Sequence, residues 1–213
     1  MPASASLPGG YTSVIVPPPG PSIAPDGFPA PPLPPNASQA FLDTMAVRIA
    51  VFCDEQKCSL EAEVDEDDPR SWSWTVYNTQ SQPVSTVRLV PPPHPAHPNG
   101  YHNPDEKPYV KLTRLATLAQ ERGNGLGKVL LQTALAWAST NQQEIGKGWE
   151  GLVLLHAQTS VEAMYAKMGF VTDAKLGKWD EEDIEHVGMW KSITVHSQGG
   201  VDGDIQSTTG TAS

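Results

Sequence analysis

The feature that most constrains the fold is a glycine-rich turn at residues 120–128, with the sequence QERGNGLGK. It follows a strand-like stretch (109–118) and opens an apolar, helix-like one (125–141). Glycines let a backbone turn tightly and approach a ligand closely, and amide groups at the start of a helix attract anions. The segment therefore predicts a strand–turn–helix unit. Its turn either holds a phosphate group or is a connection that binds no ligand.

Two common nucleotide-binding motifs are excluded by residue count. A Walker A motif ending at Gly127 and Lys128 would need glycine in place of Arg122 and Ser or Thr in place of Val129. A dinucleotide fingerprint starting at Gly123 would need glycine in place of Lys128. An ordinary ATP-binding or NAD-binding loop is therefore not expected here.

Proline divides the chain into regions. Twelve of the 21 prolines precede Asn36, in a stretch with few large apolar residues. Such a composition predicts a disordered or polyproline-II arm over residues 1–37. Residues 196–213 are rich in Gly, Ser and Thr and predict a flexible tail. One domain is expected between them, over residues 38–195, which is long enough to bury a core.

Charge and apolar patterning exclude several classes of protein. With 14 basic and 24 acidic residues, the net charge is −10, which argues against a nucleic-acid-binding protein. No apolar run approaches the roughly 20 residues that span a bilayer, and the first ten residues lack the features of a secretory signal. We expect a cytoplasmic protein without membrane contact. Two cysteines and no zinc-like spacing of Cys and His predict neither a disulfide framework nor a metal site.

The domain alternates helical and extended patterns in a way that predicts a mixed α/β fold. A long loop (91–108) with seven prolines and three histidines separates two of the strands. Loops of this length are usually functional or disordered, and we expect this one to border the substrate or a dimer partner. The expected elements are a helix over 40–58, an acidic loop over 61–68, strands over 71–78, 84–90 and 109–118, a helix over 125–141, a strand over 151–157, a helix over 160–168, and strands over 170–175 and 186–195.

Two motifs together resemble the GNAT (Gcn5-related) N-acetyltransferases. Arg122-x-x-Gly125-x-Gly127 is similar to their pyrophosphate loop, and 165–170 (YAKMGF) resembles their Y-x-K-x-G-F segment. Parts of 47–56, 63–68, 155–158 and 183–189 look like the ElaA-like branch. The resemblance implies a GNAT (acyl-CoA N-acyltransferase) fold: a mixed, mostly antiparallel sheet, splayed in the middle and flanked by helices.

The resemblance also implies acetyl-CoA as the acyl donor. The strand before the loop would hold its pantetheine arm, and the loop would hold its pyrophosphate. Gln158 stands where many members carry an asparagine that contacts the cofactor. The cofactor-binding residues expected on this basis are Leu115, Ala116, Thr117, Arg122, Gly123, Asn124, Gly125, Leu126, Gly127, Lys128 and Gln158.

The activity implied is transfer of acetyl to a primary amine of a small molecule by direct attack on the thioester. The alternatives are a protein or peptide N-acetyltransferase, or a module that binds acyl-CoA without turnover. Tyr165 matches the family position that protonates the leaving thiolate. His156 or Glu55 would remove the proton of the amine, unless His156 is structural and Glu55 a surface acid.

Arg48 and Glu63 are the expected substrate-binding residues. Alternatively, Arg48 pairs with the acidic loop and Glu63 is a solvated acid. The acidic segment 61–68 hints at a cationic acceptor such as a polyamine or an amino sugar. We expect a monomer or a homodimer.

Overall fold

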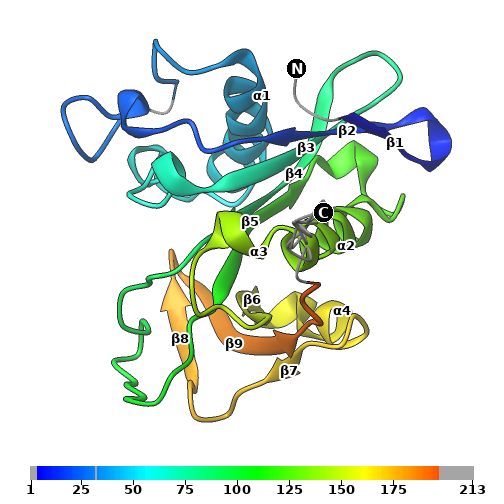
Figure 1. Cartoon of the computed structure of the whole chain (residues 1–213). Helices are drawn as coiled ribbons and strands as arrows, with labels where there is room; N and C mark the ends of the chain where they lie inside the picture. The colour runs from blue at the N-terminus through cyan, green and yellow to red at the C-terminus, as the bar shows by residue number, and fades with distance from the viewer. Residues whose placement is uncertain (1–3, 32, 197–213) are drawn as a thin grey trace, which may run out of the picture.

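A computed structural model describes residues 4–31 and 33–196 (Figure 1). Its centre is one mixed sheet with the strand order β1-β2-β3-β4-β5-β6-β9-β7, and β8 pairs with β9 outside this path. All pairings are antiparallel except that of β5 with β6. The strands are β1 (Ser4–Ser6), β2 (Thr12–Val16), β3 (Trp72–Tyr77), β4 (Pro83–Val90), β5 (Val110–Thr117), β6 (Leu152–Gln158), β7 (Val171–Thr172), β8 (Lys178–Glu181) and β9 (Ile184–Ser192).

The two long helical segments cover opposite faces of the sheet (Figure 1). The Thr44 hydroxyl of α1 (Gln39–Arg48) meets the Thr75 hydroxyl at 2.8 Å. Its neighbour Trp74 packs edge-on against Trp137 of α2 (Leu126–Thr140), with ring centroids 5.6 Å apart. Because successive side chains of a strand point to opposite faces, the two helices lie on opposite sides of β3.

Shorter helical segments complete the fold. The π-helix η3 (Ile49–Glu55) extends α1, so the helix expected over 40–58 is one continuous segment that changes its hydrogen-bonding pattern. Two short α-helices are α3 (Gln142–Ile145) and α4 (Glu162–Ala166). The 3₁₀ turns are η1 (Pro8–Gly10), η2 (Pro21–Ile23), η4 (Leu60–Ala62), η5 (Asp68–Arg70), η6 (Ala119–Glu121) and η7 (Thr159–Val161).

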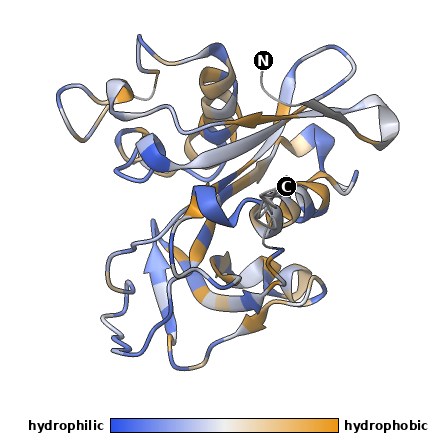
Figure 2. Ribbon diagram, in the orientation of Figure 1, coloured by the Kyte–Doolittle hydropathy of each residue, from blue (hydrophilic) through white to orange (hydrophobic). Residues whose placement is uncertain are grey.

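The main core lies between α2 and the sheet. Six residues of α2 are buried at helical spacing, which gives the helix one apolar face (Figure 2). They pack against apolar side chains of β3 to β6, including Val87, Leu112 and Val153. The buried α2 residues are Leu126, Leu130, Leu131, Ala134, Leu135 and Ala138.

The sheet separates in its middle, between β5 and β6. These two strands pair only over Val110–Leu112 and Val153–Leu155. Beyond that point β5 follows β4 and β6 follows β9. Between Thr86 and Arg88, the single Val87 faces two β5 residues, Arg114 and Leu115, and Arg114 has φ 53°. This is a β-bulge, which bends β5 where the sheet opens.

The arm expected to be disordered over 1–37 instead contributes ordered structure. Strand β2 pairs with β3 from Thr12 opposite Tyr77 to Val16 opposite Ser73. Val16, Ile23 and Ala30 form a separate buried cluster with three residues outside the arm, Phe41, Met45 and Val64. The sequence expectation failed because a few apolar residues sufficed to bind the arm to an existing sheet edge and helix. The tail expected over 196–213 lies outside the described residues, except His196.

Within the described part of the chain, no helix is both long and apolar enough to cross a membrane.

Candidate active site

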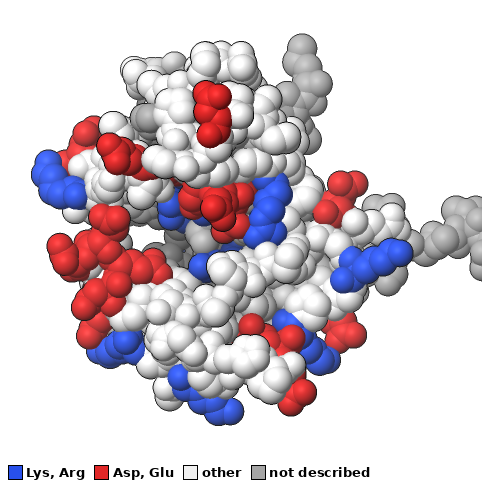
Figure 3. All heavy atoms as spheres, turned by 90° about the vertical axis from the view of Figure 1, so that its left-hand side faces the viewer, with Lys and Arg blue, Asp and Glu red and all other residues white. Residues whose placement is uncertain are grey.

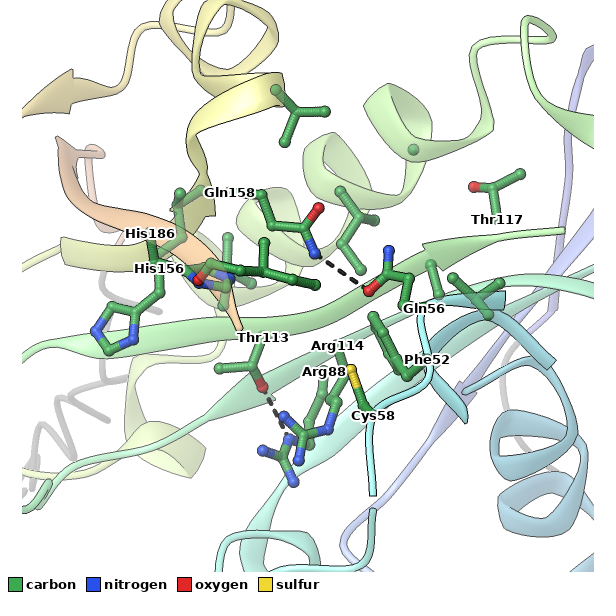
Figure 4. Close-up of a pocket in the computed structure, with 18 of the residues that line it drawn as sticks. Phe52, Gln56, Cys58, Arg88, Thr113, Arg114, Thr117, His156, Gln158 and His186 are labelled. Carbon is green, nitrogen blue, oxygen red and sulfur yellow. Dashed lines mark hydrogen bonds between the residues drawn. The ribbon is translucent and has the colours of Figure 1, made fainter. Parts of the chain in front are cut away.

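A pocket of about 860 Å³ lies where β5 and β6 diverge. Its walls come from η3, β5, the glycine turn, β6, α4 and the β8–β9 hairpin. Figure 4 shows side chains from these separate segments pointing into one space. The pocket has two ends: the start of α2 bounds one, and buried charged residues bound the other.

The first end is suited to a phosphate group. Gly123 and Gly125 have φ of 86° and 75°, which favours glycine, and a Cβ on either residue would meet nothing within 4 Å. The helix that begins at Leu126 makes its first hydrogen bond from Val129 N–H to Gly125 C=O. The N–H groups of residues 126–128 are therefore free to bind an anion at the positive end of a 15-residue helix.

All but one of the expected cofactor residues line this pocket. The exception is Asn124, whose amide donates to the Tyr11 hydroxyl at 3.2 Å and to the Glu121 carbonyl at 3.2 Å. The side chain of Gln158 donates to Gln56 at 3.2 Å across the pocket (Figure 4). The residues that line it are Leu115, Ala116, Thr117, Arg122, Gly123, Gly125, Leu126, Gly127, Lys128 and Gln158.

Glu55 lines the pocket but is held in an ion pair. The two Nη atoms of Arg122 donate to its carboxylate at 2.8 and 2.6 Å, and Nε of Arg122 donates to the Thr117 carbonyl at 3.0 Å. The hydrogen bond from Arg122 lowers the pKa of Glu55. A carboxylate that is already paired and weakly basic is a poor base for an amine, so the structure disfavours the catalytic role expected for Glu55.

Tyr165 is a buried phenol on the pocket wall. Only 8% of the residue is exposed, and its ring packs edge-on against Phe170 with centroids 6.2 Å apart. Burial raises the pKa of Tyr165 to about 12. The hydroxyl therefore keeps its proton at neutral pH and can donate it to a group in the pocket.

His156 forms a dyad with Glu181, an acid before the last strand to which sequence reasoning assigned no partner. The Nδ1 atom of His156 lies 3.0 Å from Oε1 of Glu181, and Trp179 donates its indole N–H to the same oxygen at 2.7 Å. Nε2 of His156 is buried and has no hydrogen-bond partner among the described residues. Glu181 thus orients the ring so that Nε2 can accept a proton.

The charges of this dyad suit that role. Burial lowers the pKa of His156, so its ring is neutral at neutral pH. Burial disfavours the Glu181 carboxylate, but the hydrogen bond and charge of His156 outweigh this and lower the pKa of Glu181 to about 2. An ionised carboxylate beside a neutral imidazole is the arrangement of a general base and the residue that positions it.

Arg48 does not reach the pocket, contrary to the expectation that it binds substrate. It is fully buried, and its guanidinium lies 3.0 Å from Glu63 and 2.7 Å from Asp68. Glu63 lines the pocket but is only 4% exposed and is held by this pair. The alternative that Arg48 pairs with the acidic loop is the arrangement observed.

Two further arginines extend this cluster to the second end of the pocket. Arg88 pairs with Asp65 at 2.6 Å and with Asp68 at 2.9 Å, and Arg114 pairs with Asp65 at 3.1 Å. Figure 3 shows acidic and basic side chains side by side where this face of the molecule is hollowed. The charge of the acidic loop is therefore largely neutralised within the protein.

The histidine-containing loop over 91–108 serves packing. His94 stacks on Tyr109 with centroids 4.4 Å apart, and His97 lies 2.8 Å from Glu106. No residue of the loop lines the pocket, so the expected substrate-side position is wrong. Among the residues the structure describes, no group of three His, Cys, Asp or Glu could hold a metal ion. The role of the loop as a dimer contact stays a prediction.

The pocket brings together a helix start that suits an anion, a phenol and an imidazole, which are groups that an acyl-transfer reaction can use. Comparisons with known proteins identify the class. A family model described as "Acetyltransferase (GNAT) domain" matches residues 70–172. A UPF0039 protein of Schizosaccharomyces pombe is 30% identical over 149 residues, or 69% of this chain and 84% of the relative.

Solved structures give the same result. An acyl-CoA N-acyltransferase from Pseudomonas aeruginosa is 27% identical over 71% of this chain and 89% of its own, with a TM-score of 0.55. Escherichia coli ElaA shares the fold at 21% identity, over 73% of this chain and 92% of its own, with a TM-score of 0.55. The chain belongs to the GNAT superfamily and has the acyl-CoA N-acyltransferase fold and activity class.

Proposed function

We propose that the protein transfers acetyl from acetyl-CoA to a primary amine of a small molecule. The observation that carries this proposal is a single pocket in which the glycine turn, the β5 bulge, Tyr165 and the His156–Glu181 dyad meet. The N–H groups at the start of α2 would bind the pyrophosphate, with Lys128 adding positive charge; Arg122 could add to it by exchanging its pair with Glu55 for the phosphate. The β5 backbone would hold the pantetheine arm.

The chemistry is one direct transfer. Nε2 of His156 removes one proton from the protonated amine, and the neutral nitrogen then attacks the thioester carbonyl. The C–N bond forms and the C–S bond breaks. Tyr165 gives its proton to the departing sulfur and regains one from the acylated nitrogen, so the products are the N-acetylated amine, CoA and the proton that His156 releases to solvent. A backbone N–H near the β5 bulge would stabilise the charge on the carbonyl oxygen.

A small acceptor is favoured over a peptide because residues 55–59 bridge the pocket. Gln56 meets Gln158 at 3.2 Å, and the Ser59 N–H donates to Glu182 at 3.3 Å. An extended peptide would have to break these contacts to lie across the opening. A protein or peptide N-acetyltransferase remains the alternative, and peptides belong in the amine panel below.

Calorimetric titration tests the cofactor first. Acetyl-CoA and CoA are expected to bind at one site and more tightly than ATP. Gly125→Val forces a β-branched residue into φ 75° and fills the turn, so affinity should fall at least about tenfold. Gly27→Val is the matched control, since Gly27 has φ 87° and open space but lies in the N-terminal arm. Equal acetyl-CoA affinity for Gly125→Val and wild type would refute the proposed binding site.

The value of kcat tests whether Tyr165 is the general acid. Tyr165→Phe keeps the ring that packs on Phe170 and removes the proton. We expect kcat to fall by about 10²-fold with acetyl-CoA affinity unchanged, because general acids typically contribute about 10²- to 10⁴-fold. Thiol release across a panel of amines and short peptides measures kcat. An unchanged kcat would remove Tyr165 from the mechanism.

A further inference from the structure

We propose that Lys111 binds a carboxylate of the acceptor, which makes the acceptor an amino-acid-like molecule rather than a polyamine. The inference rests on the proposed function and names the substrate class of the same pocket. At the second end of the pocket most charged side chains are paired with one another, whereas the ammonium of Lys111 has no partner among the described residues.

Lys111 lies on β5 at the point where the sheet opens. It precedes Leu112, which faces the core beneath α2, so the Lys111 side chain projects from the opposite face of the strand. It lines the pocket together with Thr113 and His156. Its ammonium makes no hydrogen bond or ion pair with any residue in the described ranges 4–31 and 33–196.

Each carboxylate at this end of the pocket is already engaged. Glu63 and Asp65 pair with arginines, as described above. Asp67 accepts from Arg70 at 2.6 Å, and Glu182 accepts from the Ser59 N–H. Glu181 accepts from Trp179 and is bonded to His156. Glu181 and Glu182 thus have only neutral partners, but the acids of segment 61–68 that line the pocket all pair with arginines, so the hint from that acidic segment is not supported.

Two hydrogen-bond donors at this end have no acceptor among the described residues: the Lys111 ammonium and one nitrogen of Arg114, whose Nη2 pairs with Asp65. Nε of Arg114 is buried and has no hydrogen-bond acceptor among the described residues, although it lies 3.6 Å from Glu63. Figure 4 shows Arg114 beside Arg88 below the opening between the strands. Burial also lowers the pKa of Lys111, against the opposing effect of Glu181. A bound anion would offset the cost of keeping this ammonium charged in the pocket.

The position of Lys111 relative to the base sets the shape of the acceptor. Lys111 lies opposite Leu154 where β5 pairs with β6, and His156 is two residues further along β6 on the same face of the sheet, so both side chains line the same part of the pocket. An acceptor that fills this part of the pocket could present its amine toward His156 and a carboxylate toward Lys111. Amino acids carry these two groups a few bonds apart.

The test compares matched pairs of amines by thiol release: phenylalanine with phenethylamine and phenylalaninamide, histidine with histamine, and lysine with cadaverine. Wild type should show a KM at least about tenfold lower for the members that carry a carboxylate. Lys111→Met keeps an unbranched side chain one atom shorter and removes the charge, and it should abolish this preference. Lys111→Arg should restore part of it. Lys147→Met, an exposed lysine outside the pocket, should behave as wild type.

Equal or better turnover of the decarboxylated amines and the amide would overturn the inference, as would a preference that survives in Lys111→Met. Acetyl-CoA titration of every variant keeps the two proposals apart. If acetyl-CoA binds and no member of the panel is acetylated, the carboxylate inference fails and the cofactor site stands. If acetyl-CoA does not bind, the proposed function itself fails.

Discussion

At the scale of single residues, the ionisation of His156 should control the rate. Burial lowers its pKa from an ordinary value of about 6.5, and the neutral form is the base. The rate should therefore be constant near neutral pH and fall as pH drops through a value below 6.5. A profile of kcat/KM against pH measures this acidic limb.

Substitutions identify the group whose protonation causes this acidic limb. His156→Gln should lower kcat/KM by about 10²-fold and remove the limb. Glu181→Gln removes the charge that favours the imidazolium, so the limb should move to lower pH while acetyl-CoA affinity stays unchanged. His102→Gln changes an exposed histidine outside the pocket and serves as control. A limb that persists in His156→Gln would assign it to another group.

Residues within local motifs could be predicted from the sequence, whereas residues defined by long-range contacts could not. Gly125 and Tyr165 were identified because each lies in a short pattern whose spacing reflects one turn or one helix. Glu181 meets His156 across 25 positions in the chain, and only the β8–β9 hairpin brings them together. Arg48 was misassigned because the sequence does not show that it is fully buried beside two acids.

At the scale of elements, the buried ion pairs join α1, the acidic loop and β4. Arg48→Met would leave Glu63 and Asp68 with one partner fewer in a buried site. Breaking a buried pair in this way typically costs about 3–5 kcal/mol, so the free energy of unfolding should fall by about that amount. Urea unfolding followed by circular dichroism at pH 7 measures the loss.

The matched control is Lys107→Met, because Lys107 pairs with Glu150 at 2.9 Å and both side chains are exposed. Exposed pairs contribute between about 0 and 1 kcal/mol, so this variant should unfold close to wild type. If Arg48→Met were no less stable than Lys107→Met, the cluster would not be what fixes the acidic loop against the sheet.

Helices and strands with a clear apolar pattern in the sequence lie where that pattern predicted them. The apolar face of α2 and the strands β3, β4 and β5 lie within a few residues of their expected bounds. The C-terminal strands did not: the segment expected over 170–175 forms only β7, and β8 pairs with β9 as a hairpin. Short, half-exposed strands carry too little apolar alternation to be located from sequence alone.

At the scale of the whole molecule, the N-terminal arm connects two parts of the protein. Strand β2 covers the edge of β3, and the Tyr11 hydroxyl donates at 2.7 Å to Glu121, at the start of the glycine turn. Asn124 of that turn donates to the same hydroxyl. The arm thereby ties the sheet edge to the turn that would hold the pyrophosphate.

Deleting residues 1–37 should therefore have two separable effects. It uncovers the edge of β3 and removes Val16, Ile23 and Ala30 from their cluster, so the melting temperature should fall and self-association should rise. Acetyl-CoA affinity should also fall.

Tyr11→Phe separates the effects, because it keeps β2 and removes only the hydroxyl. Its melting temperature should match wild type while its acetyl-CoA affinity drops a few-fold. Calorimetry and light scattering measure both properties. The arm would be dispensable to both the fold and the site if the truncated protein matched wild type in melting temperature, in self-association and in affinity for acetyl-CoA.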